Sequence, residues 1–304
     1  MELFKKRETV VQNIAYMAIM SAINVVFVLL SNILPVLLFL LVFVLPLTSA
    51  VVTLLCKKKY YPIYFIVTML LCFLISIGFS VFDTFVYVLP SLITGFIFGY
   101  AIEKRIPVIY TITVSTLVQY CLTILTFFIM SKIVANMDLL EAIIKAFGLA
   151  NYEFKAEFTQ IFLYIISLIQ ILLALFITSF EIKKLGYSIN LYCSIQYLLY
   201  IAEISIAIIA VLSYFYFPVY TIVITLIALP IYIYQLITLV LQKRIWLWVS
   251  LVAAHFALAF MYAFLYSYVL RPNHFILIFV LFGLCTIIDF LSNYCLKQNK
   301  NNIK

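Results

Sequence analysis

Three ionisable side chains fall inside long apolar stretches of the sequence: Glu203, His255 and Asp289. Charges at membrane depth are costly, so such groups usually face a partner or a cavity. At about 1.5 Å of rise per helical residue, they would lie about 18, 15 and 12 Å from the basic ends of their helices. A carboxylate near an imidazole can bind a cation or relay a proton. The alternative is a buried packing pair with a neutral acid that fixes helix register.

A second set of polar side chains is uncharged: Asn24, Gln119 and Gln170. Each falls near the middle of an apolar stretch in the first 184 residues. Together these amides could hydrogen-bond a small polar ligand. The alternative is that each links neighbouring helices, a contact typically worth about 1 kcal/mol or less. Asp83 lies in a turn, where it is either solvated or lines the mouth of a cavity.

Motifs of enzyme chemistry are absent from the sequence. It contains no HExxH, no Walker-type GxxxxGK(S/T) and no GxSxG pattern. Only two histidines are present, and none of the six cysteines forms a CxxC pair. The sequence therefore predicts no enzyme, no cofactor and no metal site.

The elements that position these side chains follow from the composition. Hydrophobic residues make up 67% of the 304 residues and charged residues only 10%. Such a surface requires lipid as its solvent. The apolar runs predict an all-α fold, a polytopic transmembrane helical bundle of about ten spans. The predicted spans are residues 11–33, 35–55, 61–79, 83–101, 107–131, 158–180, 190–212, 218–241, 245–268 and 275–296.

Positive charge is concentrated in every second connection between these spans. Of the 19 Lys and Arg residues, 15 fall at one end when the N-terminus is placed inside. The positive-inside rule then puts both termini in the cytoplasm and makes the chain a multi-pass protein of the cell membrane, with the lipid bilayer as its partner. The basic clusters are topology signals, so we expect no nucleic acid partner. They are Lys5–Arg7, Lys57–Lys59, Lys104–Arg105, Lys183–Lys184, Lys243–Arg244 and the basic C-terminus.

One connection, residues 132–157, is long. Its apolar side chains recur at helical spacing, which predicts one short amphipathic helix on the external surface. The helix is either a connector resting on lipid headgroups or a lid over a cavity that opens outward. The apolar side chains are Ile133, Met137, Leu140, Ile144 and Phe147.

The first apolar run, residues 10–34, carries small residues at helical spacing. Ala18 and Ala22 form an A-x-x-x-A pattern, with Ala15 one turn earlier. Small residues let a second helix approach closely. We therefore expect this face to be a packing seam for a partner helix.

Several segments together resemble a known family. They are the basic N-terminus, AYMAIMSAI, the proline at residue 35, VLPLTSAVV, the Lys57–Lys59 turn and LPSLITGFIFGYAIEKR. The sequence is similar to the YybS-like family of bacterial polytopic membrane proteins. More distantly, residues 10–184 resemble the S component of energy-coupling-factor vitamin transporters. The resemblance implies a six-span S-component-like domain over residues 1–184, followed by a four-span extension over 185–304. It also implies that the Ala18 and Ala22 face packs on a transmembrane coupling subunit that works with ATPases.

Three functions remain open from the sequence. The first is a substrate-binding or permease subunit for a small solute in a bacterial transporter. The second is a non-catalytic membrane scaffold or accessory factor, with tightly packed spans. The third is an ion-coupled secondary transporter that uses Glu203, His255 and Asp289.

Overall fold

The computed structural model describes residues 6–79, 84–133 and 155–190, with scattered positions between 201 and 234. The chain divides into two compact units, Met1–Tyr192 and Cys193–Lys304. All the helices named below belong to the first unit. The functional division at residue 184 stays a prediction.

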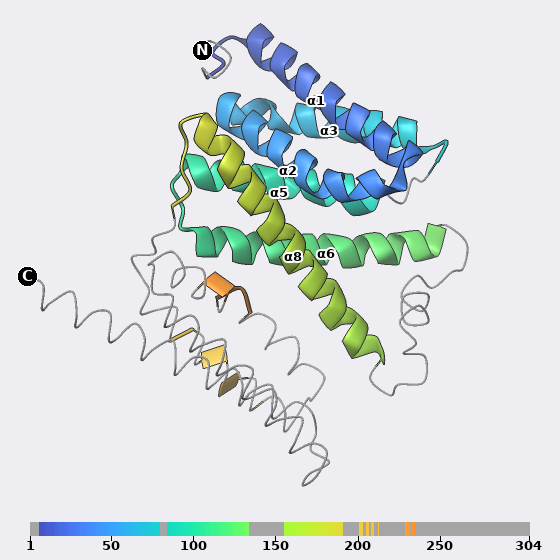
Figure 1. Cartoon of the computed structure of the whole chain (residues 1–304), viewed down its shortest axis with the longest axis vertical. Coiled ribbons are helices and arrows are strands. Elements are labelled where there is room, and N and C mark those ends of the chain that lie inside the picture. The colour runs from blue at the N-terminus through green and yellow to red at the C-terminus, as the bar shows by residue number, and fades with distance from the viewer. Residues whose placement is uncertain are drawn as a thin grey trace, which may run out of the picture. The chain divides into compact units, whose positions relative to one another are not determined.

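Every named element in the described residues is a helix, as the sequence predicts. Within the described residues, five helical segments are long and apolar enough to cross a membrane, and the apolar part of α2, Leu40–Leu55, is shorter. Five of the main helices of the described residues begin and end within four residues of the predicted spans, whereas α5 begins six residues after the predicted start at residue 83. A π-helical turn, Thr84–Val88, precedes α5. The main helices (Figure 1) are α1 Val10–Ile33, α2 Leu38–Leu55, α3 Tyr61–Ser76, α5 Leu89–Glu103, α6 Val108–Ile133 and α8 Lys155–Lys184.

The ends of α1 and α3 have local causes in the sequence. Thr9 caps α1, because its Oγ1 accepts a hydrogen bond from the backbone N–H of Gln12 at 3.2 Å. The Gln12 side chain in turn accepts from the backbone N–H of Thr9 at 3.4 Å, which completes a capping box. Pro62 lies in the first turn of α3, where its missing N–H costs no helical hydrogen bond.

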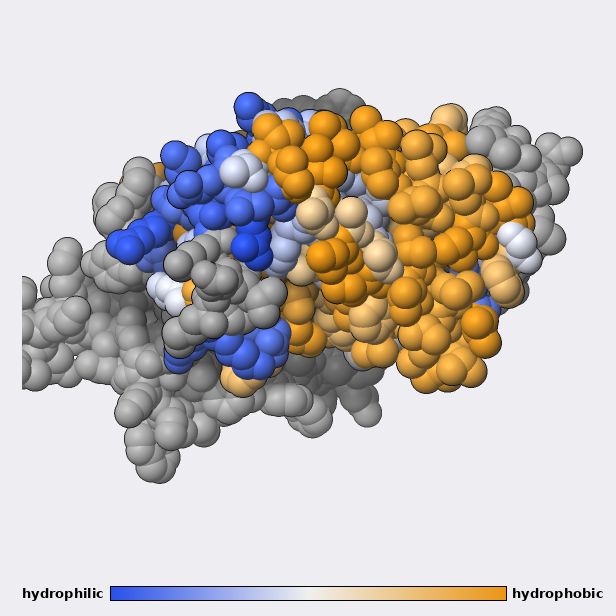
Figure 2. All heavy atoms as spheres, turned by 90° about the horizontal axis from the view of Figure 1, so that it is seen from above, coloured by the Kyte–Doolittle hydropathy of each residue, from blue (hydrophilic) through white to orange (hydrophobic). Residues whose placement is uncertain are grey.

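Helix α1 buries polar side chains and exposes apolar ones. Asn13, Ser21, Asn24 and Ser31 are all buried along one face. Many of its large apolar side chains are exposed instead, and Val11 reaches 76%. Figure 2 shows a broad hydrophobic area on the surface of the molecule, which adjoins a hydrophilic end. A soluble helix has the reverse pattern, so this surface is suited to lipid.

Helix α2 packs most extensively against α5, and also contacts α1 and α8. Two glycines of α5 make this approach possible. A Cβ atom added at Gly95 would lie 2.5 Å from Cβ of Ser49, and one at Gly99 would lie 2.6 Å from Cβ of Thr53. Gly95 and Gly99 therefore form a G-x-x-x-G contact, in which only hydrogen leaves room for the neighbouring backbone.

The basic turns gather at one end of the first unit. The backbone N–H of Arg7 donates to the carbonyl of Leu55 at 2.8 Å, which joins the N-terminal segment to the end of α2. The backbone N–H of Val108 donates to the carbonyl of Asn190 at 2.9 Å, which joins the α5–α6 turn to the segment after α8. Figure 2 shows hydrophilic residues concentrated at one end. The basic turns share one end, as expected, and their cytoplasmic placement stays a prediction.

Candidate functional site

The structure brings two of the predicted site residues together. Gln119 on α6 donates from its Nε2 to Oε1 of Gln170 on α8 at 3.1 Å. Gln119 is only 7% exposed. From the basic ends of their helices, Gln119 lies about 17 Å in and Gln170 about 21 Å in. The amide pair therefore lies near the middle of the bundle.

A small cavity adjoins the amide pair. Its volume is about 10 Å³ for the centre of a water-sized molecule, room for about one water. Its lining mixes amides and hydroxyls with apolar side chains and contains no charged residue. The lining residues are Val42, Pro46, Tyr87, Ser91, Thr94, Gln119, Gln170, Ile171 and Ala174.

Pro46 adds a backbone acceptor to this region. It lies inside α2 and has no N–H, so the carbonyl of Val42 loses its usual helical donor. Both residues line the cavity. A hydrogen-bond donor that entered the cavity could replace the missing backbone N–H.

The amide pair keeps unused hydrogen-bonding capacity. Each glutamine amide has two donor hydrogens and an oxygen with two lone pairs. The contact between Gln119 and Gln170 uses one donor and one lone pair. The remaining capacity includes both donors and acceptors without net charge, so the site suits an uncharged polar group.

Helix α6 carries a polar stripe through the same region, which we call the α6 stripe: Thr111, Ser115, Gln119 and Thr123. These residues are four apart and all buried, and the stripe is about 18 Å long. Within the described residues, the hydroxyl of Ser115 has no hydrogen-bond partner. Our reading of the sequence missed this stripe. The signal was the repeat of polar residues at every fourth position, which places them on one helix face.

Asn24 belongs to a different network. Its Nδ2 donates to the hydroxyl of Tyr64 at 2.8 Å, and its Oδ1 accepts from the hydroxyl of Thr48 at 2.7 Å. Its side chain is fully buried, and it does not line the cavity. Asn24 thus links α1 to α2 and α3, which is the linking role that the sequence left open for it.

The alanines of α1 lie on its exposed face. Ala15, Ala18 and Ala22 are all exposed within the described part of the chain. The face is therefore available to a second helix or to lipid. The role of a partner seam stays a prediction.

Four predicted site residues and the amphipathic segment stay untested. Asp83, Glu203, His255 and Asp289 lie outside the described residues, as does nearly all of the segment 132–157 except its two ends. The ion-coupled site and the external lid therefore stay predictions.

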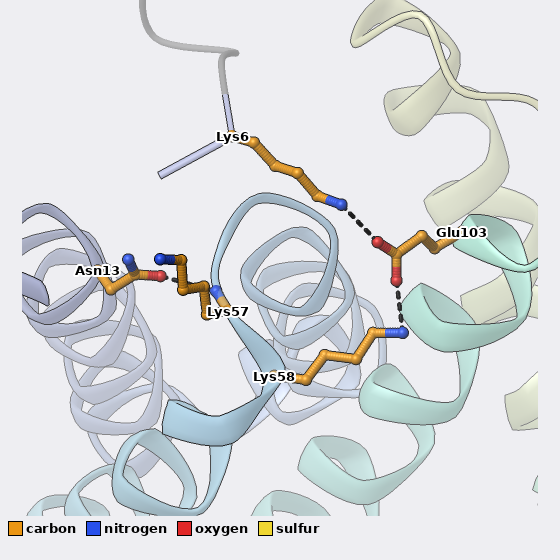
Figure 3. Close-up of polar contacts among 5 residues, drawn as sticks. All are labelled: Lys6, Asn13, Lys57, Lys58 and Glu103. Atoms are coloured by element: carbon orange, nitrogen blue, oxygen red, sulfur yellow. Dashed lines mark hydrogen bonds and ion pairs between the residues drawn. The ribbon is translucent and has the colours of Figure 1, made fainter. Parts of the chain in front are cut away.

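Glu103 forms an ionic contact at the basic end that our reading of the sequence did not single out. Its carboxylate oxygens lie 2.6 Å from Nζ of Lys6 and 2.5 Å from Nζ of Lys58 (Figure 3). The hydrogen bond to Glu103 raises the pKa of Lys6, and burial, which lowers that pKa, is the weaker effect. Nearby, the Asn13 side chain accepts from the backbone N–H of Lys57 at 2.7 Å (Figure 3). These contacts tie the N-terminal segment and the α2–α3 turn to the rest of the basic end.

Comparisons of the chain with protein-family models, with curated proteins and with solved structures find no match.

Proposed function

We propose that the chain is a multi-pass protein of the cell membrane whose first six spans form a substrate-binding or permease subunit for a small solute. The observation that supports this most directly is the pair of Gln119 and Gln170 beside a cavity at mid-depth. Amides are expensive to keep inside a bundle in lipid unless they have partners or a role. Their unused donors and acceptors are the groups that a solute would contact.

The solute would have to widen the cavity on binding. Its present volume holds about one water, whereas small-molecule sites usually occupy about 300 Å³ or more. The described conformation therefore corresponds to a closed, solute-free state in this proposal. An opening movement would separate α8 from α6 or α2.

Energy coupling would come from partners, because the sequence has no ATP-binding motif. In keeping with the YybS-like and S-component resemblance, we propose a transmembrane coupling subunit that works with ATPases. The exposure of Ala18 and Ala22 supports a seam on α1.

A membrane scaffold or accessory factor is the second candidate. The small cavity and the hydrogen bonds of Asn24 to two neighbouring helices favour it, because both are features of a bundle that packs without a ligand. This candidate predicts that removing the amides affects packing alone.

Metabolite profiling of the purified chain distinguishes the solute-binding subunit from the membrane scaffold. We expect a small polar compound to copurify with the protein and to be lost in Gln170→Leu. Gln160→Leu is the matched control, because Gln160 lies on the same helix with an exposed side chain. A chain that carries no compound, or carries it equally in both variants, supports the scaffold and contradicts the solute-binding subunit.

A further inference from the structure

Helix α5 ends in a hydrogen-bonded turn that reverses the hand of the backbone. The N–H of Ile106 donates to the carbonyl of Ala101 at 2.8 Å, and the N–H of Arg105 donates to that of Ile102 at 3.2 Å. This pair of bonds is a Schellman motif. It places Arg105 in the left-handed region, with φ of 53°.

Helix α8 ends in the same motif with a different residue. The N–H of Tyr187 donates to the carbonyl of Ile182 at 3.3 Å, and the N–H of Gly186 donates to that of Lys183 at 3.1 Å. Here the left-handed position is Gly186, with φ of 83°. Glycine is the usual residue because it has no Cβ to clash in this conformation. Arginine at the equivalent position of α5 is disfavoured by the backbone, which points to a role for its side chain.

A residue from a distant segment also stabilises the backbone conformation at Arg105. The Asn190 side chain donates from Nδ2 to the carbonyl of Arg105 at 2.9 Å. The Arg105 side chain is exposed, and no partner for its guanidinium occurs in the described part of the chain. Lys104 beside it is also exposed and without an ion pair there. The backbone is fixed, and two adjacent cations remain available.

Arg105 follows the apolar segment Thr84–Glu103 at an end of the first unit that carries excess positive charge. The described basic end holds nine Lys and Arg residues but only Glu8, Glu103 and Glu181 as acids. Glu103 already binds Lys6 and Lys58, and Glu181 binds Lys184. Figure 2 shows the hydrophilic end directly beside the hydrophobic area. The headgroups of a bilayer lie at such a boundary.

We propose that Arg105, with Lys104, forms a binding site for the phosphate of an anionic phospholipid headgroup. A guanidinium pairs with a phosphate through two parallel hydrogen bonds, which a lysine cannot reproduce. Free phosphate has the same chemistry. Arg105 lies two residues after the apolar segment Thr84–Glu103, which is long enough to cross a membrane, and this position commits the site to lipid, because the headgroup can meet the cations while the acyl chains lie against the spanning helices.

The test is native mass spectrometry of the full chain in detergent, titrated with phosphatidylglycerol or phosphatidylcholine. We expect phosphatidylglycerol to bind more tightly, and Arg105→Gly to weaken that binding about tenfold, the effect of losing one charge-assisted contact. Lys59→Gln is the matched control. It removes one charge from the same end, where Nζ of Lys59 lies 4.9 Å from the ring centre of Tyr60. This control should change binding by less than about twofold.

Arg105→Gly should fold, because glycine relieves the left-handed backbone. Arg105→Asn is a second neutral variant that tolerates this conformation and should lose binding equally. Equal losses in Lys59→Gln and Arg105→Gly would overturn the proposal, since they would show diffuse attraction alone. Equal binding of the two lipids, or displacement of the lipid by an equal concentration of inorganic phosphate, would also overturn it.

Discussion

Nε2 of Gln119 lies 3.1 Å from Oε1 of Gln170, and this hydrogen bond joins α6 to α8 inside the bundle. The two residues are 51 positions apart in the chain. Their helices pack against each other, and the backbone bond from Val108 to Asn190 brings the start of α6 close to the segment that follows α8. Two amides at similar depth on antiparallel neighbours thus meet because the helix register brings them level.

A double-mutant cycle should show that this hydrogen bond contributes little to the stability of the bundle. We expect Gln119→Leu and Gln170→Leu to couple by about 0.6 kcal/mol in the free energy of unfolding, the size typical of interhelical hydrogen bonds in lipid. The measurement is reversible unfolding in mixed micelles. A coupling above about 2 kcal/mol would assign the pair to structure rather than to ligand contact.

Replacing Asn24 should lower the stability of the bundle without affecting solute binding. Asn24→Leu removes two buried hydrogen bonds, one to the hydroxyl of Tyr64 and one from the hydroxyl of Thr48, so we expect the free energy of unfolding to fall by about 1–3 kcal/mol. Thermal unfolding in detergent gives the change. The amount of copurified solute per folded protein should stay at the wild-type level, and its loss would place Asn24 in the ligand site after all.

Gly95→Ala should disrupt the contact between α5 and α2. The added methyl group would lie 2.5 Å from Cβ of Ser49 and even closer to the carbonyl of Pro46. We expect a loss of about 1–3 kcal/mol in stability, the cost of overpacking a filled interface. Gly78→Ala is the control, because a Cβ there meets nothing within 4 Å. Equal stability of the two variants would contradict this prediction, because it would show that α2 and α5 can move apart to fit the methyl group without a loss of stability.

Glu103→Gln should loosen the N-terminal segment. It removes the carboxylate that binds Lys6 and Lys58, so we expect trypsin to cleave after Arg7 about threefold faster, as suits an ion pair at a partly exposed site. Because the Lys6 pKa is raised and the Glu103 pKa is lowered, the contact is fully present between the ordinary Glu value of 4.5 and the ordinary Lys value of 10.5. It is lost as the pH rises through the raised Lys6 pKa, and also as the pH falls through the lowered Glu103 pKa.

The matched control for this prediction is Glu181→Gln, which removes the exposed ion pair with Lys184 at the end of α8. It should leave cleavage after Arg7 unchanged. High salt should speed the cleavage in the wild type and have little effect in Glu103→Gln, because screening weakens only a contact that exists. A cleavage rate that is insensitive to both salt and Glu103→Gln would mean that the backbone bond from Arg7 to Leu55 holds the segment alone.

The helices and the depth of the amides could be predicted from the sequence, because apolar runs and basic clusters act residue by residue. The sequence did not predict which amides form hydrogen bonds with each other. Gln119 and Gln170 face each other, whereas Asn24 pairs with Tyr64 and Thr48, because depth along a helix does not specify which neighbour a side chain faces.

Arg105 shows a second limit of the sequence. The pair Lys104–Arg105 is visible as a basic cluster, but its left-handed backbone depends on hydrogen bonds to Ala101 and Ile102 and on the contact from Asn190. The contact from Asn190 joins residues 85 positions apart. A local pattern of charge therefore predicts the side of the membrane without predicting a site.

The measurement that tests the central claim most directly is the location of reporters fused to successive turns of the first unit. Our account predicts that fusions after Lys59 and Lys184 report from the cytoplasm, and that a fusion after Leu34 reports from outside. The basic turns would then share the cytoplasmic side, with the amide pair between the two membrane surfaces. A reporter after Lys184 on the external side would contradict the six-span arrangement and the placement of Gln119 and Gln170 at mid-membrane.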